Sequence, residues 1–286
     1  MKTYLWHFTS YSGFLGIITS KELWLKDTMK MNDEKDRTYG ECCVTRAITT
    51  CNEDSILYKY REIGLCPDTP LFNHYSMSFC RKENPQLWKD YAVNHEGVAL
   101  LFDLDELQMA IYNVSKFAFN EILNNRTIYY ELGIAEIEEL CATLEKKLLN
   151  NCHPMHYQRR LYLIKKLLFQ ICTGYTKEKK WAKEEEYRIC YVDEYSAKSS
   201  NIIGEILRDI RTDEKKEALY TLGLSPEQLK KDKYTLRLGN LFTSSVLPYV
   251  YIGNRCKANQ EDVGKQLNSF GFTSTKILVE GPMVNV

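Results

Sequence analysis

The chain has 286 residues, and its 38 basic and 38 acidic side chains give a formal net charge of zero at pH 7. Hydrophobic residues make up 44% and charged residues 27%, which is typical of a folded globular protein and excludes a disordered chain. Because the charge is balanced and no block of Lys or Arg occurs, non-specific binding to nucleic acid or to a membrane surface is not expected as the main activity.

Targeting and redox signals are weak. No apolar stretch of signal-peptide length follows Met1, and the most apolar region, 161–172, is short and is interrupted by Lys165 and Lys166. The ten cysteines form no Cys-x-x-Cys pair, so neither a zinc ribbon nor a thioredoxin-type site is expected. We therefore expect reduced thiols packed in a core, a cytoplasmic location and no contact with a membrane.

The first part of the chain alternates between strands and short helices. Residues 3–8 are rich in aromatic and β-branched side chains and predict a strand, and Thr9 or Ser10 then caps a short helix. A second short strand is expected over 22–25. Asn32 and Asp33 form a turn into a helix that runs through Val44 and Ile48, and residues 72–80 are again strand-like.

The remaining elements complete a mixed α+β pattern. Their expected ranges are a short helix from Pro85, a buried strand over 97–102, a strand over 126–130, helices over 135–172, a strand over 186–192, a charged helical stretch over 200–232, and strands over 246–252 and 277–279. Strands at both ends with helices between them predict one α+β domain over residues 1–286, with helical insertions at 133–183 and 200–232.

Three of these strands carry polar side chains two residues apart, a spacing that places them on one face of a strand. The pairs are His7 with Thr9, Ser76 with Ser78, and Glu184 with Glu186, the last continued by Arg188. If the strands are neighbours, one sheet face gathers a histidine, hydroxyls and two carboxylates. The alternative for each pair is the solvated side of an amphipathic strand.

The motifs around these pairs resemble a known family. His7-Phe8-Thr9-Ser10, Leu23-Trp24-Leu25 with Asn32-Asp33, Ser76-Met77-Ser78-Phe79, Leu87-Trp88-x-x-Tyr91 and Trp181-x-x-Glu184-x-Glu186-x-Arg188 are similar in order and spacing to the bacterial domain-of-unknown-function family 2971. The chain departs from that pattern at Glu34 and Lys35, where the family has Pro after the Asn-Asp turn, and at Lys183, where Tyr is usual.

That family is similar to the ADP-ribosyltransferases, and the similarity implies a split β-sheet core that binds NAD in a cleft. Its pattern of His, Ser-x-Ser and Glu-x-Glu falls on His7, on Ser76 and Ser78, and on Glu184 and Glu186. The resemblance implies that Glu186 stabilises the oxocarbenium-like centre formed when the nicotinamide–ribose bond breaks, and that Glu184 deprotonates the attacking nucleophile.

The resemblance also implies contacts with the cofactor. His7 and Thr9 would bind NAD, with His7 donating to the ribose or to the nicotinamide amide. Ser76 and Ser78 would belong to the cofactor-binding site and fix the neighbouring carboxylate or histidine, unless they only face outwards. Tyr91 or Trp88 would stack on nicotinamide unless they only pack in the core. Arg188 would contact either the NAD pyrophosphate or Glu186. Asn32 and Asp33 are expected to cap a helix first and to contact ligand second.

Three functional hypotheses follow. The first is an NAD-dependent ADP-ribosyltransferase or NAD glycohydrolase with a protein or nucleic-acid acceptor. The second is a non-catalytic module that binds a nucleotide or a protein on the same fold. The third concerns biological role: an anti-phage defence effector or toxin whose helical insertion binds a partner or an antitoxin. No metal site is expected, because Cys152, His153 and His156 lack a second ligand cluster at zinc spacing.

Overall fold

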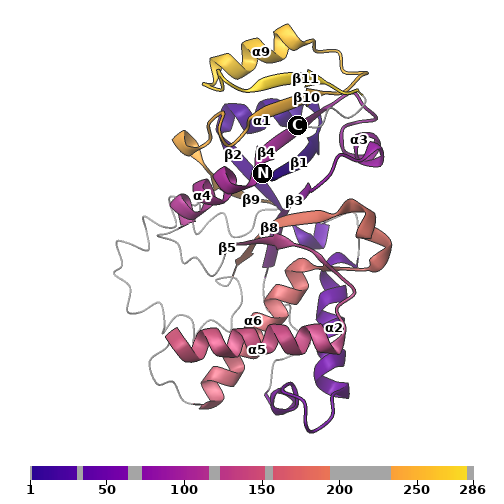
Figure 1. Ribbon diagram of the computed structural model, residues 1–286, viewed down its shortest axis with the longest axis vertical. Coiled ribbons are helices and arrows are strands. Elements are labelled where there is room, and N and C mark those ends of the chain that lie inside the picture. Colours follow the sequence, from indigo (N-terminus) through magenta and orange to yellow (C-terminus); the bar gives the residue numbers. More distant parts are fainter. Residues whose placement is uncertain are drawn as a thin grey trace.

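The computed structural model describes residues 2–30, 35–63, 73–115, 123–151, 157–193 and 233–281. Over these residues the protein is a mixed α+β structure built on a nine-stranded sheet (Figure 1). Seven strands follow one another in the order β11 (Lys276–Val279), β10 (Tyr249–Ile252), β4 (Val98–Asp103), β1 (Tyr4–Thr9), β3 (Asn73–Cys80), β2 (Glu22–Asp27) and β9 (Lys233–Arg237).

Two further strands extend the sheet beside β3. They are β8 (Glu186–Asp193), which pairs with β3 over eight residues, and β5 (Leu123–Thr127), which pairs with β8. All pairings in this sheet are antiparallel except that of β10 with β11. A separate parallel pair joins β6 (Tyr129–Tyr130) to β7 (Thr176–Lys177).

The helices are α1 (Tyr11–Ser20), α2 (Asp36–Thr50), α3 (Pro85–Tyr91), α4 (Leu104–Ser115), α5 (Ile134–Asn151), α6 (Tyr157–Tyr175) and α9 (Gln260–Ser269). Ser10 caps α1 by accepting from the Gly13 N–H, and Pro85 is the first residue of α3, as predicted. The predicted strands and helices within the described ranges are confirmed to within a few residues. The sequence analysis missed α4, β9 and α9.

The sheet splits at β3. A strand has two edges, and β8 covers one edge of β3 along its full length. The other edge is shared: Cys80 pairs with Trp6 of β1, whereas Ser76 pairs with Lys26 of β2. Strands β1 and β2 therefore diverge from the same edge of β3, and between these contacts no strand of the described residues lies beside that edge.

The pairing register assigns side chains to the two faces. Tyr75, Met77 and Phe79 of β3 lie on the face that packs against α1, in the main hydrophobic core, and the alternate residues of β8 join them there. Ser76 and Ser78 lie on the opposite face, in register with Cys190 and Arg188. The alternation expected for β3 and β8 is thus confirmed.

Helices α2, α5 and α6 form a second core at one end of the molecule, and we call this group the helical lobe (Figure 1). The apolar positions predicted on two helical faces, including Ile137 and Leu168, are buried there. A Cβ on Gly40 of α2 would collide with the carbonyl oxygen of Cys172 in α6, so glycine allows the two helices to approach closely. The predicted insertion at 133–183 is helical over most of its length but also contains β7, and α2 lies outside it.

The cysteines in the described ranges are all free thiols, and six of these eight are buried, as predicted. Within those ranges we find no helix with the length and apolar character needed to span a membrane. The predicted helical stretch 200–232, the turn at Asn32 and Asp33, and the Cys152–His156 segment lie outside the described residues.

Candidate functional site

A pocket of about 410 Å³ lies where β1 and β2 diverge from β3. Residues from both faces of the sheet line it: Ile17 of α1 and Met77 come from the core face, and Glu186 and Arg188 from the other. The pocket therefore extends through the split. Eight of the site residues predicted from the sequence line it, namely His7, Thr9, Ser76, Ser78, Tyr91, Glu184, Glu186 and Arg188, whereas Trp88 does not.

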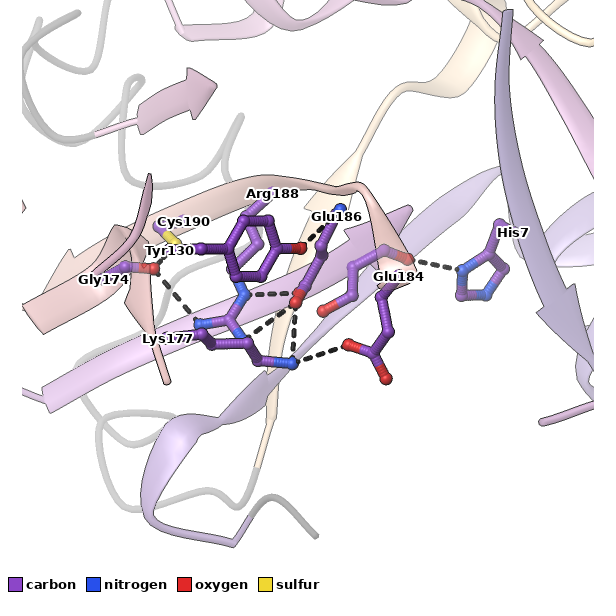
Figure 2. Close-up of polar contacts among 9 residues, drawn as sticks. His7, Tyr130, Gly174, Lys177, Glu184, Glu186, Arg188 and Cys190 are labelled. Carbon is purple, nitrogen blue, oxygen red and sulfur yellow. Dashed lines mark hydrogen bonds and ion pairs between the residues drawn. The ribbon is translucent and has the colours of Figure 1, made fainter. Parts of the chain in front are cut away.

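His7 reaches the pocket by a different route from the one predicted. The Trp6–Cys80 pair places Trp6, and not His7, on the same sheet face as Ser78 and Glu186. The expectation that His7 shares that face was wrong, because Trp6 is paired with Cys80 and the next residue of the strand, His7, points to the opposite face. The imidazole instead occupies the uncovered edge of β3, where its Nδ1 lies 3.0 Å from the carbonyl oxygen of Ser78 (Figure 2).

This contact determines what His7 can do. A carbonyl oxygen only accepts, so Nδ1 carries the hydrogen and Nε2 is left as an acceptor. Burial lowers the pKa of His7 to about 4, and the imidazole is neutral at pH 7. We predicted that His7 donates a hydrogen bond to a ligand. In this arrangement Nε2 of His7 would instead accept a hydrogen bond from an O–H or N–H group of the ligand.

Four charged side chains form a network on the other side of the pocket (Figure 2). Nζ of Lys177 lies 2.7 Å from Glu186 Oε2 and 3.0 Å from Glu184 Oε2. Nε of Arg188 lies 2.5 Å from Glu186 Oε1, and a second guanidinium nitrogen lies 3.3 Å from Glu186 Oε2. Lys177 thus connects the two carboxylates, and we call these four residues the charge network.

The two carboxylates arrive from different local structures. Glu184 ends a 3-10 helix, η3 (Lys179–Glu184), and Glu185 then adopts a left-handed conformation with φ of 43° before β8 begins at Glu186. The spacing predicted that the two carboxylates are neighbours on one strand face. The structure shows that they are not, because Glu184 lies before the strand begins. Lys177 of β7 nevertheless holds both side chains at the pocket.

Their protonation equilibria differ. Burial opposes ionisation of Glu186, but the charges of Arg188 and Lys177 outweigh it and lower its pKa to about 2. The pKa of Glu184 is raised, chiefly by burial, although Lys177 works in the opposite direction. Glu186 is therefore ionised at neutral pH, and Glu184 is the carboxylate whose pKa moves towards the range of a general base.

Arg188 belongs to this network. Its side chain is 1% exposed, and besides Glu186 it donates to the carbonyl oxygen of Gly174 at 3.2 Å. Of the two predicted partners, Glu186 is the one observed, and the guanidinium is engaged by protein groups. The backbone N–H of Glu186 donates to the hydroxyl of Tyr130, which fixes the start of β8.

The remaining predicted residues divide by exposure. Trp88 is 1% exposed and packs in a core, whereas Tyr91 is 43% exposed at the pocket and offers a ring face. Ser76 is 1% exposed, so it is not the solvated residue of the alternative interpretation. Its hydroxyl has no hydrogen-bond partner among the described residues, and the predicted bond to a carboxylate or histidine is not seen.

Sequence reasoning assigned no role to several other pocket residues, among them Lys177, Lys26, Trp24 and Trp181. Lys177 and Lys180 each lie 5.4 Å from the ring centroid of Trp181, whose buried Nε1–H has no hydrogen-bond partner within the described ranges. Trp24 is 39% exposed. Its position on the same strand face as Lys26 was a usable signal, since both point to the pocket side of β2.

With this geometry in place, comparison with known families becomes informative. Residues 87–189 match the family described as Protein of unknown function (DUF2971). The match contains Tyr91, the charge network and most of the helical lobe, and it confirms the predicted resemblance over that stretch. It leaves out β1, where His7 lies, and the Ser76–Ser78 segment. No curated protein and no solved structure matches the chain.

Proposed function

We propose that the pocket binds NAD and that the protein cleaves the nicotinamide–ribose bond, as an ADP-ribosyltransferase-like enzyme or an NAD glycohydrolase. One observation carries this proposal: eight residues chosen from separate segments by their resemblance to that chemistry line a single pocket at a split in the sheet. Aromatic side chains and cations on the same wall suit a ligand that combines flat rings with phosphates.

The two carboxylates fit separate roles in this reaction. Breaking the glycosidic bond leaves positive charge on the ribose, and the ionised Glu186 is placed to stabilise it. Glu184 has the raised pKa that suits a base for the attacking water or acceptor. His7 would accept a hydrogen bond from a ribose hydroxyl or from the carboxamide N–H, and Tyr91 would stack on a ring.

A specific observation favours a second candidate, a module that binds the nucleotide without cleaving it. Glu186 is already paired with Arg188 and Lys177, so its negative charge is largely compensated. A carboxylate in that state stabilises a cationic centre less than an unpaired one does. The helical insertion would in either case bind the partner or antitoxin of the predicted defence or toxin role.

Nicotinamide release from NAD tests the first candidate. We expect wild-type protein to release nicotinamide and Glu184→Gln to lower the rate by roughly a hundredfold, within the range for loss of a general base. Glu185→Gln is the matched control, because the Glu185 side chain is 42% exposed and pairs with Lys82 on the surface. Its rate should match the wild type.

Calorimetry with NAD separates the two candidates. Binding without release, with and without added protein or nucleic-acid acceptors, would replace the enzyme by the binding module. If NAD neither binds nor is cleaved under conditions where a known enzyme works, both candidates are wrong.

A further inference from the structure

A buried hydroxyl on the pocket wall lacks a partner. Ser76 is 1% exposed, and its Oγ has no hydrogen bond to any described residue. Buried polar groups are nearly always paired, so an exception at a pocket wall points to a group that arrives with a ligand. A hydroxyl can donate to an acceptor-rich group, and phosphate oxygens are such acceptors.

A cation lies beside this hydroxyl. Lys26 of β2 is directly paired with Ser76 of β3, and directly paired residues in an antiparallel sheet point to the same face with Cβ atoms roughly 5 Å apart. Lys26 is exposed and also lines the pocket. Its charge adds to the burial that lowers the pKa of His7, so the ammonium acts on the pocket interior.

The pocket is electrically divided. Two acids line it, and both are held in the charge network: Lys177 pairs with Glu184 and with Glu186, and Arg188 pairs with Glu186. Lys26 is not part of that network: it lies on β2, one of the two strands that diverge at the split. Ser10 and Gly13 at the N-terminus of the ten-residue helix α1 also line the pocket, and a helix N-terminus favours an anion.

We propose that Ser76 and Lys26 form an anion subsite that takes a phosphate of the bound nucleotide. The subsite replaces the predicted contact between Arg188 and pyrophosphate. The subsite rests on the proposed function, because that proposal identifies the ligand as a nucleotide. The subsite adds which end of the pocket holds the phosphates, namely the end at Ser76 and Lys26.

Calorimetry with ADP-ribose and with adenosine tests the subsite without requiring turnover. We expect Lys26→Met to weaken ADP-ribose binding about tenfold and to reduce its dependence on salt, while adenosine binding stays unchanged. Ser76→Ala should weaken ADP-ribose severalfold, and Lys26→Arg should restore most of the affinity. Lys89→Met, at an exposed lysine of α3 outside the pocket, is the matched control.

Inorganic pyrophosphate gives an independent measurement. It should compete with ADP-ribose in the wild type and lose this competition in Lys26→Met. If Lys26→Met binds ADP-ribose as tightly as the wild type, or adenosine and ADP-ribose weaken equally, the subsite is wrong.

The two proposals fail separately. Loss of ADP-ribose affinity in Lys26→Met, in a protein that does not cleave NAD, would support the subsite and reject the enzyme. Cleavage of NAD with an unchanged KM in the same variant would support the enzyme and reject the subsite.

Discussion

Lys177→Met is the most informative change in the charge network. The Lys177 side chain is 9% exposed, and its Nζ lies within 3.0 Å of both carboxylates. At an effective dielectric constant of about 20, each contact corresponds to roughly 6 kcal/mol of attraction before desolvation is counted. Methionine removes the cation and keeps the volume, so Glu184 loses its cation and Glu186 keeps only Arg188.

We expect the free energy of unfolding to fall by about 3 kcal/mol at neutral pH, the lower end of the range for breaking a buried ion pair. The loss is smaller than the Coulomb figure because Arg188 still pairs with Glu186 and because Glu184 can take up a proton. Protonation costs about 1.4 kcal/mol for each unit between its pKa and the pH.

The pH dependence follows from the sign of the two shifts. In the wild type Glu186 has a pKa of about 2, below its unfolded value, so it stabilises the protein above that value and loses this effect as pH falls. The raised pKa of Glu184 acts in the opposite direction: its contribution is present at low pH and is lost as pH rises. Removing Lys177 raises both pKa values, so the deficit should be largest near pH 8.5 and smallest near pH 5, both approximate assay conditions.

Denaturant unfolding at these two pH values and at neutrality measures the effect. Lys179→Met is the control, because that side chain is 74% exposed and its pair with Glu131 is worth little. The double variant Lys177→Met/Glu184→Gln should recover part of the lost free energy of unfolding, because the second change removes the Glu184 carboxylate that the first leaves without its cation. A deficit below about 0.5 kcal/mol, or one that is equal at both pH values, would refute the reasoning, because ordinary surface changes give as much.

Two further predictions concern packing and charge. Glu186→Gln should lower the free energy of unfolding by about 3–5 kcal/mol, because Arg188 is then buried without a carboxylate; a loss under about 1 kcal/mol in denaturant unfolding would show that the pair is not structural. Gly40→Ala should lower it by about 1–3 kcal/mol through overpacking against Cys172, which thermal unfolding would detect, whereas an unchanged midpoint would mean that α2 and α6 separate at no cost.

Most elements could be predicted because their signals are local. Pro85 and Ser10 act within one helical turn, and the apolar run of β4 is buried at all six positions. Some local signals were available and not used: Asn259 and Asp262 form a capping box at the start of α9. Strand β9 has no such signal, because it is short and its pairing with β2 involves a distant segment.

The residues that line the site could be predicted from the sequence, but their arrangement in space could not. Residue types and spacing brought together His7, Ser76 and Glu186, and all three line the pocket. The face on which His7 lies depends on how β1 meets β3, a long-range register that no local pattern encodes. Lys177 follows α6 on a two-residue strand, and its choice of partners is set by how the helical lobe meets the sheet.

The charge network also gives the two candidate functions different energetic requirements. It contains two carboxylates and two cations, so it is neutral as a unit when both acids are ionised. A cationic centre that Glu186 stabilises must compete with Lys177 and Arg188 for this carboxylate, and Lys177 also holds Glu184, the proposed base. An enzyme of the proposed class therefore requires Lys177 to move aside when the substrate binds. A binding module requires no such movement, so a lysine side chain that stays in place with NAD bound would favour binding without cleavage.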